Sequence, residues 1–195
     1  MPRAGLGPEM VAAAAADLAD EIGLANVTMA QVAERLGVRT PSLYKHVGGQ
    51  SDLTRRIGVI ALNELADNLR DELQGRAQRD ALAAAATTFR TFVTEHPGRY
   101  AATVRLDTNG PDDPLVTAGA RVVAALSAVL AGYGIPDCDA IHALRTMRSL
   151  LHGFAVLEAA GGFQMDTDVN DSFTWLVGFL HHGLQAASGE HPRLP

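Results

Sequence analysis

A short segment near the N-terminus concentrates side chains that can donate hydrogen bonds to an anion. Residues 28–53, TMAQVAERLGVRTPSLYKHVGGQSDL, hold the only lysine of the chain, Lys45. The donors that surround it are Arg39, Thr40, Ser42, Tyr44 and His46. Such groups contact phosphate oxygens and base edges in protein–DNA complexes. The segment therefore predicts a contact with nucleic acid.

The charge of the chain is unevenly placed. The 195 residues carry 16 Lys and Arg against 22 Asp and Glu, but residues 28–56 hold five basic and two acidic side chains. A basic segment on an acidic chain suits a confined contact with a polyanion, because the rest of the chain would repel one. A solvated helix surface would explain the charge equally well, so charge alone does not decide.

The N-terminal pattern predicts two helices that come before the donor cluster. One covers residues 8–22, where apolar side chains recur at helical spacing, and Gly23 ends it. The next covers residues 28–36. It begins with Thr28 and Gln31, a pair spaced so that each side chain caps the backbone amide of the other.

A third, short helix is predicted to begin at Thr40, with Pro41 at a position where its missing N–H costs nothing. Leu43 and Val47, four residues apart, anchor it in the core. The outward positions are Ser42, Lys45 and His46. A helix, a turn with glycine and a short polar helix together form a helix-turn-helix.

The outward face of the short helix has the composition of a major-groove reader. Small and polar residues at its first turn, Thr40, Pro41 and Ser42, could touch thymine methyls and base edges. Tyr44 and His46 are spaced to reach the flanking phosphates.

The run VTMAQVAERLGVRTPSLYKHVGGQSDL resembles the helix-turn-helix of the TetR family of bacterial transcriptional regulators. The matching positions are Thr28, Ala33, Leu36, Gly37, Leu43, Tyr44, His46 and Val47. The resemblance implies a dimeric repressor that binds double-stranded DNA at a palindromic site. The predicted DNA-binding residues are Thr28, Arg39, Thr40, Pro41, Ser42, Tyr44, Lys45, His46 and Gln50.

One position departs from the family pattern. The family usually places a lysine where this chain has Gln50, so a phosphate contact from there would be uncharged and weaker. Arg55 and Arg56 follow within two helical turns. They either compensate for the missing charge or turn to solvent.

The rest of the chain predicts further helices and no strands, so the expected fold is all-α. The predicted spans are 51–73, 77–95, 98–106, 114–132, 137–160 and 169–187. Residues 1–56 are expected to form the helix-turn-helix domain. Residues 57–195 are expected to form a helical bundle that binds a ligand and dimerises.

The segment RTMRSLLHGFAVLEAAGGF at 145–163 resembles the C-terminal domain of the TetR-family branch named for a Trp-His-Gly signature, with Leu151 in place of the tryptophan. The last helix has one apolar stripe and, on another side, Trp175 and Phe179. Two apolar faces predict burial on both, which a homodimer provides; a central helix within one subunit is the alternative. The predicted interface residues are Leu151, Phe173, Leu176, Val177, Leu180 and Leu184.

Aromatic and polar residues of the middle helices could line a cavity for a small apolar effector. They are Phe89, Phe92, Tyr100, Arg105, Met147 and Phe154, and each could equally belong to the core. The resemblance implies that the effector tilts the helix at 51–73 and releases DNA.

Other classes of function have little support. The seven histidines form no metal-binding spacing, and no nucleophile or phosphate-loop motif is present, so neither an enzyme nor a cofactor is expected. No signal peptide is seen, and the longest apolar run, at 122–135, is too short to span a bilayer. A cytoplasmic protein without a membrane partner is predicted. A helical protein-interaction module without DNA binding is the alternative.

Overall fold

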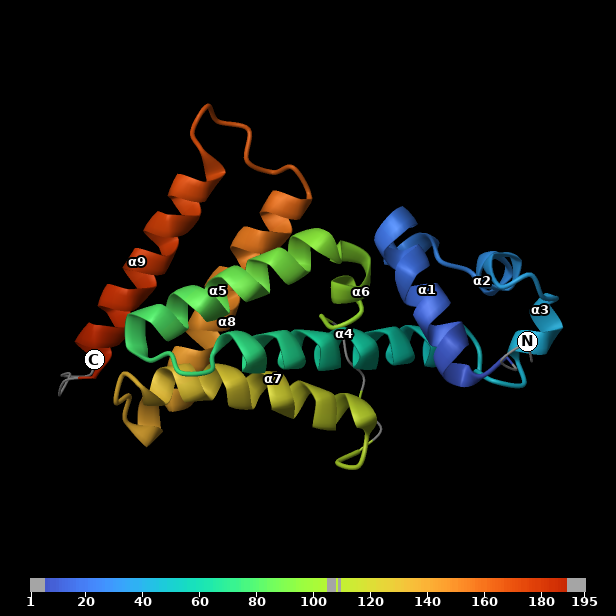
Figure 1. Cartoon of the computed structure of the whole chain (residues 1–195), viewed down its shortest axis with the longest axis horizontal. Helices are drawn as coiled ribbons and strands as arrows, with labels where there is room; N and C mark the ends of the chain where they lie inside the picture. Colours follow the sequence, from blue (N-terminus) through green and yellow to red (C-terminus); the bar gives the residue numbers. More distant parts are fainter. Residues whose placement is uncertain (1–5, 105–107, 109, 189–195) are drawn as a thin grey trace, which may run out of the picture. The chain divides into compact units, whose positions relative to one another are not determined.

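The computed structural model describes residues 6–104, 108 and 110–188, and every regular element in those ranges is a helix (Figure 1). This confirms the all-α prediction. The elements are α1 (Pro8–Ile22), η1 (Leu24–Asn26), α2 (Met29–Arg35), α3 (Thr40–Leu43), α4 (Gln50–Glu72), α5 (Gln78–Glu95), α6 (Pro97–Ala101), α7 (Pro114–Ala131), α8 (Asp137–Ala159) and α9 (Val169–Ala187).

Most helix limits lie within one residue of the predicted ones, with two exceptions. Helix α3, which was predicted to include Val47, ends at Leu43. Helix α6 was predicted over 98–106 but ends at Ala101. The Thr103 hydroxyl donates to the Tyr100 carbonyl oxygen at 2.8 Å, and the Thr103 amide bonds to the same oxygen. Such competition for a backbone carbonyl slightly destabilises an α-helix. The short 3₁₀ turn η1 was not predicted.

The chain divides into two compact units. The first unit comprises residues 1–64 and 95–119, and the second comprises residues 65–94 and 120–195. The domain boundary predicted between residues 56 and 57 falls inside the continuous helix α4. The first unit also takes in α6, which the sequence-based division had placed in the other domain.

The core of the first unit joins α1 to the helix-turn-helix. Val11 and Ala15 of α1 are completely buried, as are Val32 of α2, Leu43 of α3 and Leu53 of α4. Burial of one such leucine stabilises the fold by about 1.5–3 kcal/mol. The apolar stripe that the sequence predicts for residues 8–22 thus holds the short helix α3 from behind.

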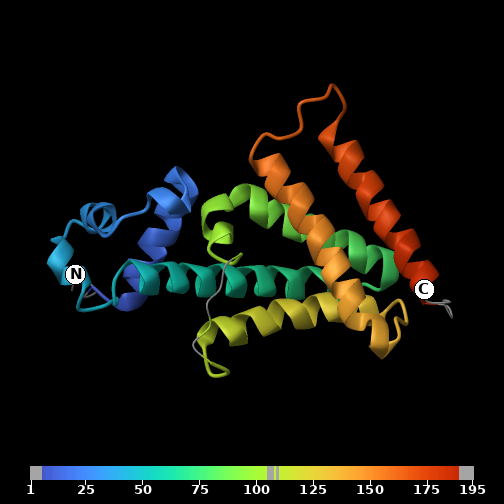
Figure 2. The same ribbon diagram turned by 180° about the vertical axis from the view of Figure 1, so that it is seen from behind.

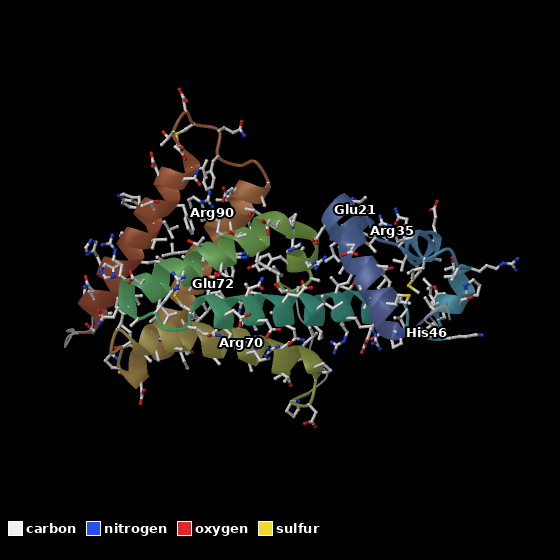
Figure 3. The ribbon with its side chains drawn as sticks, viewed as in Figure 1. Glu21, Arg35, His46, Arg70, Glu72 and Arg90 are labelled. Atoms are coloured by element: carbon white, nitrogen blue, oxygen red, sulfur yellow. The ribbon has the colours of Figure 1, made fainter. Side chains whose placement is uncertain are left out.

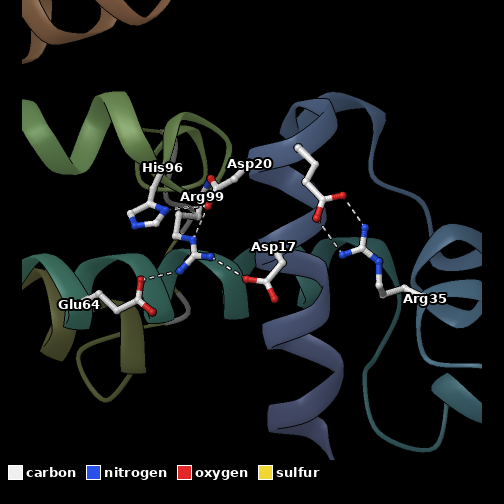
Figure 4. Close-up of polar contacts among 7 residues, drawn as sticks. Asp17, Asp20, Arg35, Glu64, His96 and Arg99 are labelled. Carbon is white, nitrogen blue, oxygen red and sulfur yellow. Dashed lines mark hydrogen bonds and ion pairs between the residues drawn. The ribbon is translucent and has the colours of Figure 1, made fainter.

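Helix α6 packs unusually closely on α1. A Cβ atom placed on Gly98 would lie 1.7 Å from the carbonyl oxygen of Ala19, so only glycine fits there. Next to it, Arg99 is 9% exposed and donates to Asp20 at 2.7 Å, to Asp17 at 2.9 Å and to Glu64 of α4 at 2.8 Å (Figure 4). This guanidinium ties α1, α4 and α6 together.

In the second unit, α8 and α9 run antiparallel and are joined by the loop at 160–168 (Figure 2). Arg90 of α5 donates to Glu158 of α8 at 2.6 Å, and its guanidinium carbon lies 4.6 Å from the ring centroid of Phe173 in α9. One side chain, labelled in Figure 3, therefore links three helices of this unit.

Helix α7 corrects the prediction that no apolar stretch is long enough to cross a membrane. Over Pro114–Ala131 its mean hydropathy is 1.7, and 33% of it is buried, which satisfies the requirement by length and composition alone. Core helices of soluble proteins satisfy it too. The apolar residues Leu115, Leu126, Val129 and Leu130 of α7 are buried, so part of its apolar surface packs within this fold.

Candidate nucleic-acid interface

The turn between α2 and α3 is built from local signals in the sequence. Thr28 caps α2: its hydroxyl oxygen accepts from the Gln31 amide at 3.3 Å, and the Gln31 side chain accepts from the Thr28 amide at 2.9 Å. At the other end Gly37 has φ +65°, a conformation that glycine adopts without strain. Pro41 lies in the first turn of α3, as predicted.

Helix α3 presents its predicted contact residues outward. Leu43 and Val47 are buried at 0% and 3% exposure, whereas Tyr44 is 59% exposed. All nine predicted DNA-binding residues are exposed or half-buried, and seven of them lie together on 39–46. The structure thus gathers these seven on one side of the two buried anchors.

Ion pairs within the protein determine which cations of the basic segment, residues 28–56, are left to bind an anion. Arg35 donates to Glu21 of α1 at 2.9 Å, and both residues are labelled in Figure 3. Arg56 donates to Asp52 at 2.9 Å, and Arg55 pairs with the buried Asp113. Among the five cations of residues 28–56, all of them described, the two without an ion pair are Arg39 and Lys45.

The segment therefore has fewer cations without an ion pair than its sequence suggests: two of the five. Arg55 and Arg56 pair with carboxylates, so a phosphate would compete with those ion pairs for either arginine, and their compensating role stays a prediction. Asp52 and Asp113 were missed by sequence reasoning. Asp52 lies four residues before Arg56 and could have been found by helical spacing. Asp113, 58 residues from Arg55, leaves no local signal.

The same contacts lower the pKa values of two carboxyl groups, Glu21 and Asp52. The hydrogen bond from Arg35 holds the pKa of Glu21 below its usual range. For Asp52, burial raises the pKa, but the Gly48 amide and the Arg56 guanidinium outweigh that effect and lower it. The Gly48 amide donates to the Asp52 carboxylate at 2.9 Å, so Asp52, in the first turn of α4, binds the backbone just before the helix.

Two of the predicted contact residues are already engaged. The Gln50 amide nitrogen donates to the Val27 carbonyl oxygen at 2.9 Å, and the Thr28 hydroxyl donates to Gln31 at 2.7 Å. A phosphate would have to displace these bonds, so both roles stay predictions.

The predicted pocket residues lie in the packed interior. Phe89, Phe92, Met147 and Phe154 are buried in the second unit, and Tyr100 is buried in the first. Phe154 is covered by Phe163 and Phe173, at ring-centroid distances of 4.8 and 5.2 Å. Arg105 lies outside the described residues. As lining of an effector pocket, these residues stay a prediction.

The predicted interface residues are mostly turned toward their own protomer. Leu151, Phe173, Leu180 and Leu184 are at most 6% exposed, and Leu176 and Val177 are half-buried. The exposed face of α9 instead carries Trp175 and Phe179, at 72% and 59% exposure. Their rings stack with centroids 5.5 Å apart. Of the two apolar stripes read from the sequence, one is covered and one is open.

Two family models match this chain, one in its N-terminal part and one in its C-terminal part. Residues 11–57 match the family described as bacterial regulatory proteins, tetR family, and residues 82–180 match the tetracyclin repressor-like C-terminal domain. A Mycobacterium tuberculosis protein, the uncharacterized HTH-type transcriptional regulator Rv0681, is 36% identical over 93% of this chain and 83% of its own length. The uncharacterized HTH-type transcriptional regulator YobS of Bacillus subtilis is 33% identical over 94% and 95%. The Trp-His-Gly branch is not confirmed by these matches.

Solved structures share the fold at lower identity. BioQ with its double-stranded DNA operator superposes with a TM-score of 0.66 at 23% identity, covering 93% of this chain and 99% of that one. A TetR variant from Acinetobacter baumannii AYE in complex with minocycline gives a TM-score of 0.69 at 23% identity, covering 92% and 97%.

Proposed function

The chain belongs to the tetR family of bacterial regulatory proteins, and from this premise we propose that it is a cytoplasmic, ligand-responsive repressor. It binds a palindromic operator as a homodimer and is released by a small effector. One observation carries the proposal: the unpaired cations Arg39 and Lys45 flank the half-buried polar residues Thr40 and Ser42 of α3, and Leu43 and Val47 anchor the segment in the core.

The proposed contacts follow from this geometry. A helix that enters the major groove reads bases with the short side chains of its first turn, here Thr40, Pro41 and Ser42. Tyr44 and His46, in the turn after α3, bind the flanking phosphates, and Lys45 in the same turn binds the adjoining backbone. Arg39 at the N-cap reaches either a guanine or the adjoining backbone.

A dimer is proposed because one helix as short as α3 offers few base contacts. Two-fold symmetry doubles them and sets the two reading helices ~34–36 Å apart, one turn of DNA, or a multiple of that. The stacked pair Trp175 and Phe179 supplies an exposed apolar face that a second copy would cover. A four-helix contact of α8 and α9 with their copies suits this face.

Release by an effector is proposed as a shift between two conformations of the dimer. An effector that binds one conformation more tightly weakens operator binding by its differential affinity. BioQ with its operator and the TetR variant with minocycline, similar in fold, are bound to partners of the two kinds proposed here.

Selection of bound fragments from random double-stranded DNA tests the proposal directly. We expect a palindromic winner whose affinity falls steeply with salt, by about 0.9 in log–log slope for each phosphate neutralised. Lys45→Ala should lower that slope by about one unit for each subunit of the dimer. Arg76→Ala, which removes an exposed arginine of the second unit, is the matched control and should leave the slope unchanged.

Two results would count against a DNA-binding regulator: no enriched sequence, and weak binding even at low salt. A protein-interaction module would then explain the fold better, and its partner would be sought through the apolar face of α9.

A further inference from the structure

Lys45 carries the only side-chain amine of the protein. The chain has 16 Lys and Arg, and every one except Lys45 is an arginine. The lysine lies in the turn after α3, and its side chain is exposed. Among the described residues it forms no ion pair. Its Nζ is therefore open to solvent and to reagents.

A lysine at this position has a reactivity that an arginine would lack. Both side chains bind phosphate, and the planar guanidinium of arginine binds it in two places at once. The lysine amine, unlike the guanidinium, can lose its proton and then act as a nucleophile. Acylation of the amine removes its charge. A DNA-reading surface that contains a lysine can thus lose a cation by covalent modification.

The surroundings of Lys45 suit an acyl donor that carries phosphate. Arg39, which also has no ion pair among the residues described, and the 59% exposed Tyr44 lie on the same short segment. Between Glu34 and Asp52 the sequence contains no acidic residue. Arginine and tyrosine side chains bind phosphate oxygens. An anionic acyl phosphate is therefore attracted to the surface that is proposed above to bind DNA, whereas a neutral acyl donor is not.

We propose that Lys45 is acylated at Nζ by an acyl phosphate. The unprotonated amine attacks the carbonyl carbon and forms the C–N bond. The bond between that carbon and the bridging oxygen breaks, and inorganic phosphate leaves with the electron pair. The proton of the amine passes to the departing phosphate or to water, and a neutral amide remains. Arg39 and Tyr44 position the donor by binding its phosphate oxygens.

The proposal predicts a selective reaction. Only about 0.4% of ordinary lysine amines are unprotonated at pH 8, so acylation is slow unless the donor is held beside the amine. A donor that is bound next to its nucleophile reacts faster because the encounter no longer limits the rate. Lys45 should therefore be favoured over other lysines by an acyl phosphate, and should lose that advantage with a donor that the surface does not bind.

Incubation of the full-length protein with acetyl phosphate at about pH 8, followed by peptide mass spectrometry, tests the site. Arg79→Lys supplies a competitor amine, because Arg79 is exposed and, in the part of the chain that the structure describes, has no ion pair either. In this variant Lys45 should be acetylated at least about tenfold faster than the lysine at position 79. The acetyl ester of N-hydroxysuccinimide, a neutral donor, should modify the two lysines at similar rates.

Removal of one cation separates phosphate binding from simple exposure. Arg39→Ala should slow the acetylation of Lys45 by acetyl phosphate by about tenfold and leave its rate with the ester unchanged. Arg35→Ala is the matched control, because Arg35 belongs to the same helix-turn-helix but is paired with Glu21. Three results would each overturn the inference. They are equal rates of the two lysines with acetyl phosphate, the same preference with the neutral ester, and an unchanged rate in Arg39→Ala.

The effect of the modification on DNA binding rests on the function proposed above. Protein acetylated at Lys45 should bind the selected operator at least about tenfold more weakly, with a salt slope lower by about one unit per subunit. Lys45→Arg keeps the charge and resists acetylation, so treatment with acetyl phosphate should not change its operator affinity.

The two readouts distinguish failure of the site from failure of the proposed function. Selective acetylation of Lys45 in a protein that binds no operator would contradict the proposed function and leave the modification site intact. Operator binding without selective acetylation would do the reverse. Equal operator affinity before and after acetylation of Lys45 would overturn the role of the modification in releasing DNA.

Discussion

The side-chain amide of Gln50, at the first residue of α4, donates a 2.9 Å hydrogen bond to the carbonyl oxygen of Val27, the residue before the cap of α2. This bond joins the start of α4 to the segment just before α2, 23 residues earlier in the chain. It also occupies the position where the family usually has a lysine. The bond gives Gln50 a structural role beside the DNA contact that the family pattern predicts for this position.

Replacing Gln50 by lysine should therefore change stability and DNA binding in opposite directions. Gln50→Lys replaces the amide donor to Val27 by a longer, flexible ammonium group and should lower the free energy of unfolding by up to about 1 kcal/mol. It adds a cation beside the reading helix of each subunit and should steepen the salt dependence of DNA binding by about one unit per subunit. Denaturant unfolding and binding isotherms across salt concentrations measure the two effects. Gln50→Ala, the control, should lose stability with no steeper slope; an equal slope in both variants would contradict the charge argument.

The contact between Gly98 and Ala19 predicts a large effect from one methyl group. Gly98→Ala would place Cβ 1.7 Å from a backbone oxygen, so α6 must move away from α1. We expect a loss of about 3 kcal/mol in the free energy of unfolding, the upper end for overpacking. Gly119→Ala in α7 is the control, since its Cβ would meet nothing within 4 Å, and it should gain up to about 1 kcal/mol. Equal stability of the two variants would show that the close approach is not required.

Local signals in the sequence explain what could be predicted. Caps and breakers such as Thr28, Gly37 and Pro41 act within four residues, and they fixed the helix limits. The buried positions of α3 followed from the spacing of Leu43 and Val47. These features specify the helix-turn-helix because helix ends depend on neighbouring residues.

What could not be predicted depends on packing between distant segments. The sequence does not reveal that Arg55 pairs with Asp113, 58 residues away. Nor does it reveal that Phe163 and Phe173 cover the ring of Phe154. Which stripe of α9 turns inward is likewise set by the neighbouring helices. Helical spacing reveals that two faces are apolar and says nothing about which one is covered.

The shifted carboxylate of Asp52 predicts a specific dependence of stability on pH. Although burial raises its pKa, the Gly48 amide and Arg56 lower it further, so the folded protein favours the ionised form. A group with a depressed folded-state pKa stabilises above its unfolded pKa, near 4, and the effect is lost as the pH falls. Asp52→Asn should therefore cost about 1 kcal/mol at neutral pH, as for a lost helix cap, and the difference from wild type should shrink below about pH 4.

Unfolding of both proteins in denaturant between pH 7 and pH 2.5 measures this difference. Asp112→Asn, a change at an exposed carboxylate without an ion pair among the described residues, is the control and should run parallel to wild type. If the difference in free energy of unfolding between wild type and Asp52→Asn is the same at every pH, the charge of Asp52 does not contribute to the stability of the α4 N-terminus.

The open face of α9 predicts that assembly and folding can be separated by mutation. Trp175 is 72% exposed, so Trp175→Ser removes little packing within one protomer and should change its free energy of unfolding by less than about 0.5 kcal/mol. If a second copy covers this residue, the dissociation constant of the dimer should rise by at least about tenfold, the usual effect of losing a central aromatic contact. Leu184→Ala, at a residue 6% exposed, should instead cost about 2–5 kcal/mol in folding. Sedimentation equilibrium and thermal unfolding of the two variants give both quantities, and an unchanged dimer in Trp175→Ser would move the interface away from this face.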